Sequence, residues 1–184
     1  MDVMGGLGEG GDSTTLAGVR NLMLHFTPYA EHWSKLPLKV SGEGSYVTDG
    51  KGNTFIVGLA GLFTTQVGHG RTELAEAARR QMKGLGFFPN WSFQHPRSLE
   101  LAAELARIAP GDLNSTFFVS SGSEAVETVI ELVRQYYKAN GESGRYKIVS
   151  SKVAYHGTTM GALSATGIPA YKASFEPLLD GLAV

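Results

Sequence analysis

Residues 116–150, TFFVSSGSEAVETVIELVRQYYKANGESGRYKIVS, decide the fold class of this chain. Thr116–Val119 is a short apolar run of β-prone residues and predicts a buried strand, as Lys147–Ser150 does further on. Between them, Glu124–Lys138 carries apolar residues at helical spacing, which predicts an amphipathic helix. Strand, helix and strand within roughly thirty residues indicate a βαβ unit, in which the two strands run parallel. We therefore predict an α/β fold.

The residues before this unit predict a hairpin and two helices. The β-prone runs Tyr46–Asp49 and Thr54–Val57 flank the turn sequence GKGN, which is a strong hairpin signal. Apolar residues recur at helical spacing over Leu74–Met82, with charged residues between them. Pro96 then favours a helix start, and the apolar stripe after it predicts a helix over Arg97–Ile108.

Composition and charge exclude several classes of function. The 184 residues contain 16 Lys and Arg against 17 Asp and Glu, a formal net charge of −1. This balance argues against a nucleic-acid partner and against binding to an acidic membrane surface. The chain has no cysteine, which excludes disulfides, cysteine-ligated zinc, iron–sulfur clusters and a thiol nucleophile, and makes the cytoplasm the default compartment. We expect no metal site and no membrane-spanning segment.

The first motif with chemical meaning is the Ser/Gly turn between the predicted strand and helix. A strand that runs into such a turn directs free backbone N–H groups and the positive end of the helix dipole at one point, which suits a phosphate. Gly122 allows a close approach to the backbone, and the hydroxyls of Ser121 and Ser123 are further donors. The alternative is that one of these serines only caps the helix. The residues alone leave both interpretations open.

The second motif is Ala154–Gly157, which follows the next predicted strand. In an open α/β sheet the ligand crevice lies beyond the carboxyl ends of neighbouring strands, so this loop and the Ser/Gly turn are expected to face the same place. The ring of Tyr155 beside a phosphate site suggests a flat cofactor. The alternative is a packing tyrosine followed by a surface histidine, His156.

Several short motifs occur in one consistent order along the chain. They are Gly42–Gly44, Asp49, Gly52, Ala60–Leu62, Gly68–Gly70, Ser121–Ala125, Tyr155–Thr158 and Gly161. In these residues the chain, from about Leu24 to its end, resembles the class III pyridoxal-phosphate aminotransferases. The likeness is closest to the ω-aminotransferase branch.

The resemblance implies a fold-type I transferase with pyridoxal 5'-phosphate as cofactor. In that family the residues matching Gly122 and Ser123 bind the cofactor phosphate, with Ser121 beside them. The tyrosine matching Tyr155 stacks on the pyridine ring, next to His156.

Three segments are expected along the chain. Because five glycines in the first eleven residues make this stretch costly to order, we expect residues 1–20 to form a flexible arm. The resemblance implies the other two segments. Residues 21–65 form an N-terminal segment with the hairpin, part of the small domain. Residues 66–184 form the first part of the large, cofactor-binding domain.

The substrate pocket of the ω branch is lined with aromatic side chains. The matching positions here are Phe26, Phe63 and Trp91. For each of them, plain core packing is the alternative. Phe63 stands where the ω branch often has tryptophan, which weakens any inference about the substrate.

Family members transfer an amino group from an amine or ω-amino acid to an oxo acid such as pyruvate, and they normally form homodimers. Their Schiff-base lysine comes from a later part of a longer chain, so we expect an N-terminal fragment without a catalytic residue of its own. Lys152 lies closest to the predicted site, and we interpret it as a solvated lysine. The alternative function is a non-catalytic remnant or interaction subunit that retains the phosphate site.

Overall fold

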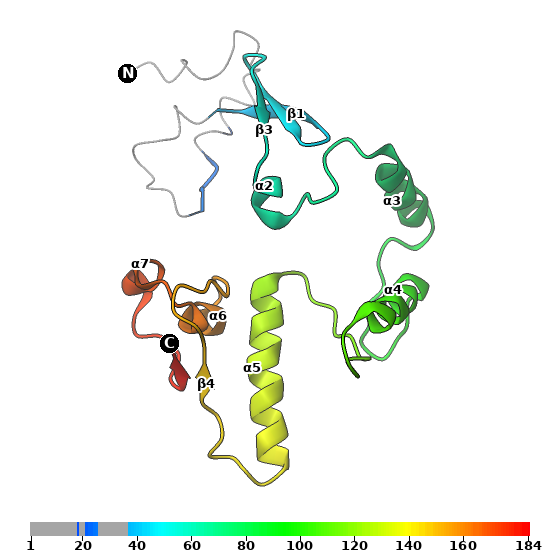
Figure 1. Ribbon diagram of the computed structural model, residues 1–184. Coiled ribbons are helices and arrows are strands. Elements are labelled where there is room, and N and C mark those ends of the chain that lie inside the picture. The colour runs from blue at the N-terminus through cyan, green and yellow to red at the C-terminus, as the bar shows by residue number, and fades with distance from the viewer. Residues whose placement is uncertain (1–17, 19–20, 26–36) are drawn as a thin grey trace. The chain divides into compact units, whose positions relative to one another are not determined.

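The computed structural model describes residues 18, 21–25 and 37–184 (Figure 1). Phe26 and nearly all of the expected arm lie outside the described residues. The chain divides into two compact units, residues 1–93 and 94–184, and each is described here by itself. In the described part, no helix is long and apolar enough to cross a membrane.

The first unit contains a three-stranded antiparallel sheet in the order β1 (Lys39–Glu43), β2 (Tyr46–Asp49) and β3 (Thr54–Ile56). Val47 pairs with Gly42 on one side and with Phe55 on the other. The predicted hairpin is therefore confirmed, and its second strand ends one residue earlier than expected.

Asp49 closes the hairpin turn. Its side chain is buried, and Oδ1 accepts hydrogen bonds from the backbone N–H groups of Lys51 at 3.0 Å and Asn53 at 2.9 Å. The Asn53 side chain donates to Oδ2 at 3.1 Å and is the largest cause that holds the pKa of Asp49 below its ordinary value. The GKGN turn is thus organised by the residue that precedes it.

Two glycine motifs that lie far apart in the sequence meet beside this sheet. The backbone N–H of Gly44 donates to the carbonyl of His69 at 3.0 Å, and the N–H of His69 donates back to the carbonyl of Gly44 at 2.8 Å. After β3 the chain forms a single turn, α2 (Ala60–Phe63), in which all four residues have positive φ. For residues other than glycine this left-handed conformation costs roughly 1–2 kcal/mol each.

Two of the predicted helices are confirmed at nearly the expected positions. They are α3 (Thr72–Leu85) in the first unit and α4 (Pro96–Ile108) in the second. The His95 side chain caps α4 by accepting the backbone N–H of Arg97 at 3.2 Å, and Pro96 occupies the first turn as its sequence position predicts.

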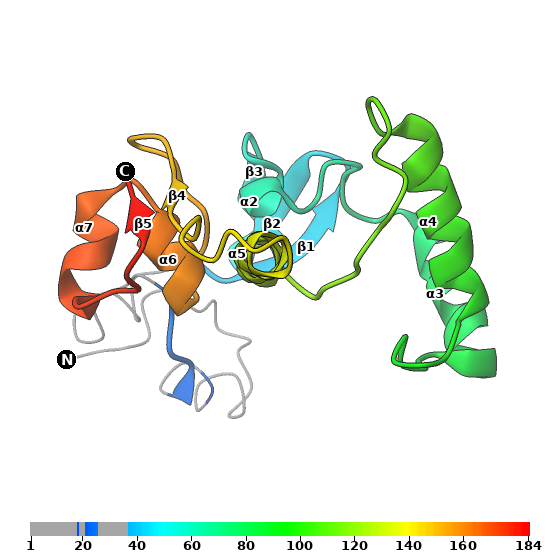
Figure 2. The same cartoon turned by 90° about the horizontal axis from the view of Figure 1, so that it is seen from below.

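The second unit continues with a long helix and a small α/β layer (Figures 1 and 2). Its remaining elements are α5 (Gly122–Ala139), β4 (Ile148–Val149), α6 (Met160–Ala165), α7 (Pro169–Lys172), the 3₁₀ turn η3 (Ala173–Phe175) and β5 (Leu182–Ala183). β4 and β5 are parallel, with Ile148 opposite Leu182. α6 contacts α5 on one side and α7 and β5 on the other.

The predicted strand Thr116–Val119 is wrong. These residues form a loop between α4 and α5, and Phe117 is 76% exposed. A β-prone sequence becomes a strand only where a neighbour completes its backbone hydrogen bonds, and none of the described residues does so here. The predicted parallel pair is therefore absent, and the parallel partner of β4 is β5 instead. The α/β class is unaffected.

The core of the second unit is centred on α6. Ala162, Leu163 and Ala165 are buried, together with Ser164 on the same helix and Ile130 on α5. The small side chains of α6 let it lie close to both neighbours, because little bulk separates the backbones. This packing brings the start of α5 near the loop that precedes α6.

Candidate functional site

The start of α5 is a capped helix terminus. The Ser121 hydroxyl accepts the backbone N–H of Glu124 at 3.2 Å, and Oε2 of Glu124 accepts the N–H of Ser120 at 2.7 Å. This reciprocal arrangement is close to a capping box. Ser121 is therefore the N-cap, as the alternative interpretation of this motif held, and its hydroxyl hydrogen remains available to a further acceptor.

The next two residues, Gly122 and Ser123, present backbone donors that no acceptor in the described part of the chain uses. No hydrogen bond of the described residues involves the backbone N–H of Gly122 or Ser123. A Cβ placed on Gly122 would meet no atom within 4 Å, so the space above this turn is open. Two unpaired N–H groups at the positive end of an 18-residue helix fit a phosphate group.

The loop before α6 lies against this helix start. The backbone N–H of Thr158 donates to the Ser123 hydroxyl at 3.0 Å. Gly157 has a φ of +137°, and a Cβ there would overlap Ser123 Oγ and approach Ala162 Cβ to 2.9 Å. The two sequence motifs, which are more than thirty residues apart, are thus brought together as expected. The expected reason, two neighbouring parallel strands, does not hold, because the strand before α5 is absent and the loop is held by its contacts with Ser123 instead.

A buried threonine holds the loop on α6. Thr166 is fully buried; its hydroxyl accepts the backbone N–H of His156 at 3.0 Å and lies 3.2 Å from the Ala162 carbonyl, to which it can donate. Tyr155 remains 55% exposed, and its ring meets that of Tyr171 edge to face with centroids 6.3 Å apart. The loop therefore has a fixed backbone and an aromatic ring with free surface.

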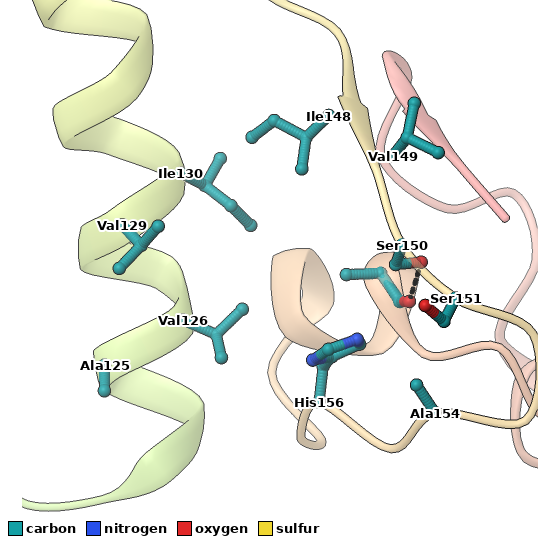
Figure 3. Close-up of a pocket in the computed structure, with 11 residues that line it drawn as sticks. Ala125, Val126, Val129, Ile130, Ile148, Val149, Ser150, Ser151, Ala154 and His156 are labelled. Carbon is teal, nitrogen blue, oxygen red and sulfur yellow. Dashed lines mark hydrogen bonds between the residues drawn. The ribbon is translucent and has the colours of Figure 1, made fainter.

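An apolar cavity of about 450 Å³ lies between α5 and β4 (Figure 3). Val126 and Ile130 of α5 point into it, opposite Ile148 and His156. Nε2 of His156 is buried and has no hydrogen-bond partner among the described residues. The cavity lies beside the candidate site.

Replacing Thr166 by Val is expected to lower the free energy of unfolding of the second unit by about 1–3 kcal/mol. The shape of the side chain is kept, but the N–H of His156 loses its acceptor. Urea unfolding followed by circular dichroism measures the change. Thr158→Val is the matched control, because the side chain of Thr158 is exposed. Equal effects of the two substitutions would contradict this role of Thr166.

None of the three candidate pocket residues belongs to the described part of the second unit, which contains this site. Phe63 and Trp91 belong to the first unit, where they are 70% and 85% exposed, and Phe26 lies outside the described residues. Phe63 is the last residue of the left-handed turn α2. The substrate roles of these residues, and the cofactor roles of the five residues on α5 and its loop, stay predictions.

Glu127 is a site residue that the sequence interpretation missed. Its Oε1 accepts the backbone N–H groups of Gly161 at 2.8 Å and Ala162 at 3.2 Å. The nearby Thr159 hydroxyl first, and then these two N–H groups, hold the pKa of Glu127 below its ordinary value, against the opposing effect of burial. Thr159 Oγ1 is buried and makes no hydrogen bond within the described residues, so the two N–H groups are the hydrogen bonds that the geometry supports. The sequence feature that could have pointed to Glu127 is a charged residue next to Val126, on the face of α5 that packs inward.

The sequence profile of the class III aminotransferases matches residues 29–183. The chain belongs to this family. A probable aminotransferase of Mycobacterium tuberculosis is 51% identical over 164 residues, covering 88% of this chain and 34% of the relative. The β-alanine–pyruvate aminotransferase of Pseudomonas aeruginosa is 36% identical over 163 residues, covering 87% of this chain and 36% of that enzyme. The chain thus spans about a third of the length of these curated relatives.

Solved structures agree with this assignment. A transaminase from the marine bacterium Virgibacillus superposes with a TM-score of 0.89 at 37% identity, covering 93% of this chain and 39% of that one. An amine transaminase from an uncultivated Pseudomonas species, solved in its PLP-bound internal aldimine form, gives a TM-score of 0.80 at 32% identity, covering 88% and 37%. The predicted family and the fold-type I class are both confirmed.

Proposed function

We propose that this protein is an aminotransferase that uses pyridoxal phosphate to move an amino group from an amine or ω-amino acid to an oxo acid such as pyruvate. The observation that carries the proposal is the pair of unpaired N–H groups at the start of α5, beside the Tyr155 loop, in a class III chain. A β-alanine–pyruvate aminotransferase among the relatives supports the choice of pyruvate.

The residues of this chain bind and orient the cofactor. The N–H groups of Gly122 and Ser123 hold the phosphate, and the hydroxyls of Ser121 and Ser123 add donors. The Tyr155 ring packs on the cofactor ring and excludes water from that face, with His156 beside it. When bound, pyridoxal phosphate supplies the electron sink that amino-group transfer needs.

Other parts of the proposal rest on the family. Phe26, Phe63 and Trp91 line the substrate pocket, and the working protein is a cytoplasmic homodimer. A small pocket of aromatic side chains would favour amines with an apolar substituent, because burying that substituent is favourable. The domain limits 1–20, 21–65 and 66–184 belong to the same proposal.

Pyridoxal phosphate is expected to form no stoichiometric lysine adduct with this 184-residue chain. Every described lysine except Lys172 is exposed, and the Lys172 amine donates to the Ser164 carbonyl at 2.9 Å. A nucleophilic lysine is activated by burial in an apolar pocket or by a neighbouring cation, and an exposed amine lacks the first of these. Borohydride reduction followed by peptide mapping measures adducts. A stoichiometric adduct on one lysine, Lys152 above all, would show that the chain carries its own Schiff-base residue.

The reaction itself is tested on the protein purified from its own cells. Incubation with β-alanine and pyruvate is expected to produce alanine in proportion to the pyruvate consumed. If no amine donor yields alanine while pyridoxal phosphate still binds, the proposed reaction fails and a non-catalytic phosphate-binding subunit is favoured instead.

A further inference from the structure

Two side chains on one face of α5 hold the segment that follows the Tyr155 loop. Ser123 and Glu127 are four residues apart and therefore lie one helical turn from each other on the same face. The Ser123 hydroxyl accepts the N–H of Thr158, and the Glu127 carboxylate accepts the N–H groups of Gly161 and Ala162. The segment from Thr158 to Ala162 is thus attached to α5 at two points.

Glu127 supplies a cap that α6 does not have by itself. Thr159 is the N-cap residue of α6, but its side chain makes no capping hydrogen bond to the helix backbone. The first N–H groups of a helix need an acceptor, and a carboxylate there also meets the positive end of the helix dipole. Gly161 has no Cβ where one would overlap the Glu127 carboxylate, so the close approach of the carboxylate depends on this glycine.

The position of α6 in turn fixes the loop that carries Tyr155. Thr166, directly after α6, accepts the backbone N–H of His156. The N–H of Gly167 donates to the Ala154 carbonyl at 2.7 Å, so both flanks of Tyr155 are tied to the C-terminal end of α6. A shift of α6 along α5 would therefore move Tyr155 relative to Gly122 and Ser123.

We infer that Glu127 is a positioning residue for the cofactor: by capping α6 from α5, it sets the position of the Tyr155 ring relative to the phosphate-binding start of α5. The inference rests on the proposed function, because it takes the ring and the helix start to hold one molecule. Glu127 does not touch the cofactor. Replacing Glu127 should therefore change the affinity only of ligands that contact both the start of α5 and the Tyr155 ring.

Two probes test this inference: pyridoxal phosphate, which would contact both parts of the site, and inorganic phosphate, which would contact only the start of α5. In Glu127→Gln the side chain keeps its size but loses its charge, and charge-assisted hydrogen bonds are roughly twice as strong as neutral ones. We expect the affinity for pyridoxal phosphate to fall about tenfold. The affinity for inorganic phosphate is expected to stay within about twofold or to rise, because a negative charge has been removed one turn away.

Glu131→Gln is the matched control. It makes the same chemical change one turn further along α5, at an exposed side chain. It is expected to leave both affinities unchanged. Loss of both affinities in Glu127→Gln, or unchanged affinity for pyridoxal phosphate, would overturn the inference.

Amide hydrogen exchange separates this inference from the proposed function. If the native chain binds neither probe, the phosphate site proposed at the start of α5 fails. The amides of Gly161 and Ala162 then decide whether Glu127 attaches α6 to α5: faster exchange in Glu127→Gln, and not in Glu131→Gln, upholds the attachment. Equal exchange in the two variants overturns it.

The native chain offers a measurement in case Glu127→Gln does not fold. The pKa of Glu127 is lower in the folded chain than in the unfolded chain. The carboxylate therefore contributes its full stabilisation at pH values above the ordinary glutamate pKa. This stabilisation is lost as the pH falls through the pKa of Glu127 in the folded chain. The amide resonances of Gly161 and Ala162 are expected to shift together as Glu127 becomes protonated. The neighbouring elements carry other titratable or charged groups: Glu124, Glu131, Arg134, Tyr136, Tyr137, Lys138, Tyr155, His156, Tyr171 and Lys172. Amides that follow one of these groups, or do not shift, would contradict the inference.

Discussion

Replacing Gly122 by Asp is expected to weaken the binding of pyridoxal phosphate by roughly 10- to 100-fold without unfolding the chain. The new side chain has room, since a Cβ at Gly122 meets no atom within 4 Å. An acidic residue in the first turn also stabilises a helix, so the fold is not penalised. The carboxylate, however, occupies and repels the place that the phosphate would take. Fluorescence titration with pyridoxal phosphate measures the loss.

Gly122→Asn separates charge from size. It adds nearly the same volume without a negative charge and is expected to retain most of the affinity. Unphosphorylated pyridoxal provides a second control, because its weaker binding is expected to be insensitive to the aspartate. If Gly122→Asp binds pyridoxal phosphate as tightly as the native chain, the phosphate does not bind at the start of α5.

Replacing Gly157 by Ala is expected to lower the free energy of unfolding of the second unit by about 2–4 kcal/mol. Two effects add. The φ of +137° is unfavourable for any residue with a side chain, and the new methyl group would overlap Ser123 Oγ and lie 3.0 Å from Ser123 Cα. Because the backbone of α5 cannot yield cheaply, the loop has to move away from the helix. Urea unfolding followed by circular dichroism measures the change.

Gly141→Ala isolates the conformational part of this effect. Gly141 also has a positive φ, +79°, but a Cβ there would meet no atom within 4 Å. Its replacement is expected to lower the free energy of unfolding by only about 1 kcal/mol. Equal losses at the two positions would mean that the loop does not pack closely on the start of α5.

Structure that depends on neighbours in sequence could be predicted from the sequence. The hairpin follows from β-prone runs around GKGN, and Asp49 lies next to the turn that it organises. The helix α5 follows from apolar spacing and from a serine at its N-cap. In each case the residues that stabilise the element lie within a few positions of it, so the local pattern contains the cause.

The strand expected at Thr116–Val119 shows the limit of this approach. Its β-prone side chains are compatible with a strand, but strand formation depends on a partner that the local sequence does not specify. The parallel partner of β4 is β5, more than thirty residues later. Only the chain topology, and not the composition of either segment, determines that pairing.

Some residues of the candidate site could likewise be predicted from local sequence, and others could not. The Ser/Gly turn and the Tyr155 loop could be found because each is a local motif with a chemical meaning. Glu127 and Thr166 could not, because their roles are contacts across 34 and 10 positions of sequence. A glutamate on an inward helix face and a threonine after a short apolar helix are individually common, and only the fold shows which amides they accept.

Whether the start of α5 holds the cofactor phosphate is tested most directly by titrating the isotope-labelled chain with pyridoxal phosphate and following its backbone amide resonances. The amides of Gly122 and Ser123 are expected to shift most, to saturate together, and to shift in the same direction with inorganic phosphate. The amide of Tyr155 is expected to respond to pyridoxal phosphate alone. Saturable shifts centred on other residues, with the amides of Gly122 and Ser123 unmoved, would contradict the account.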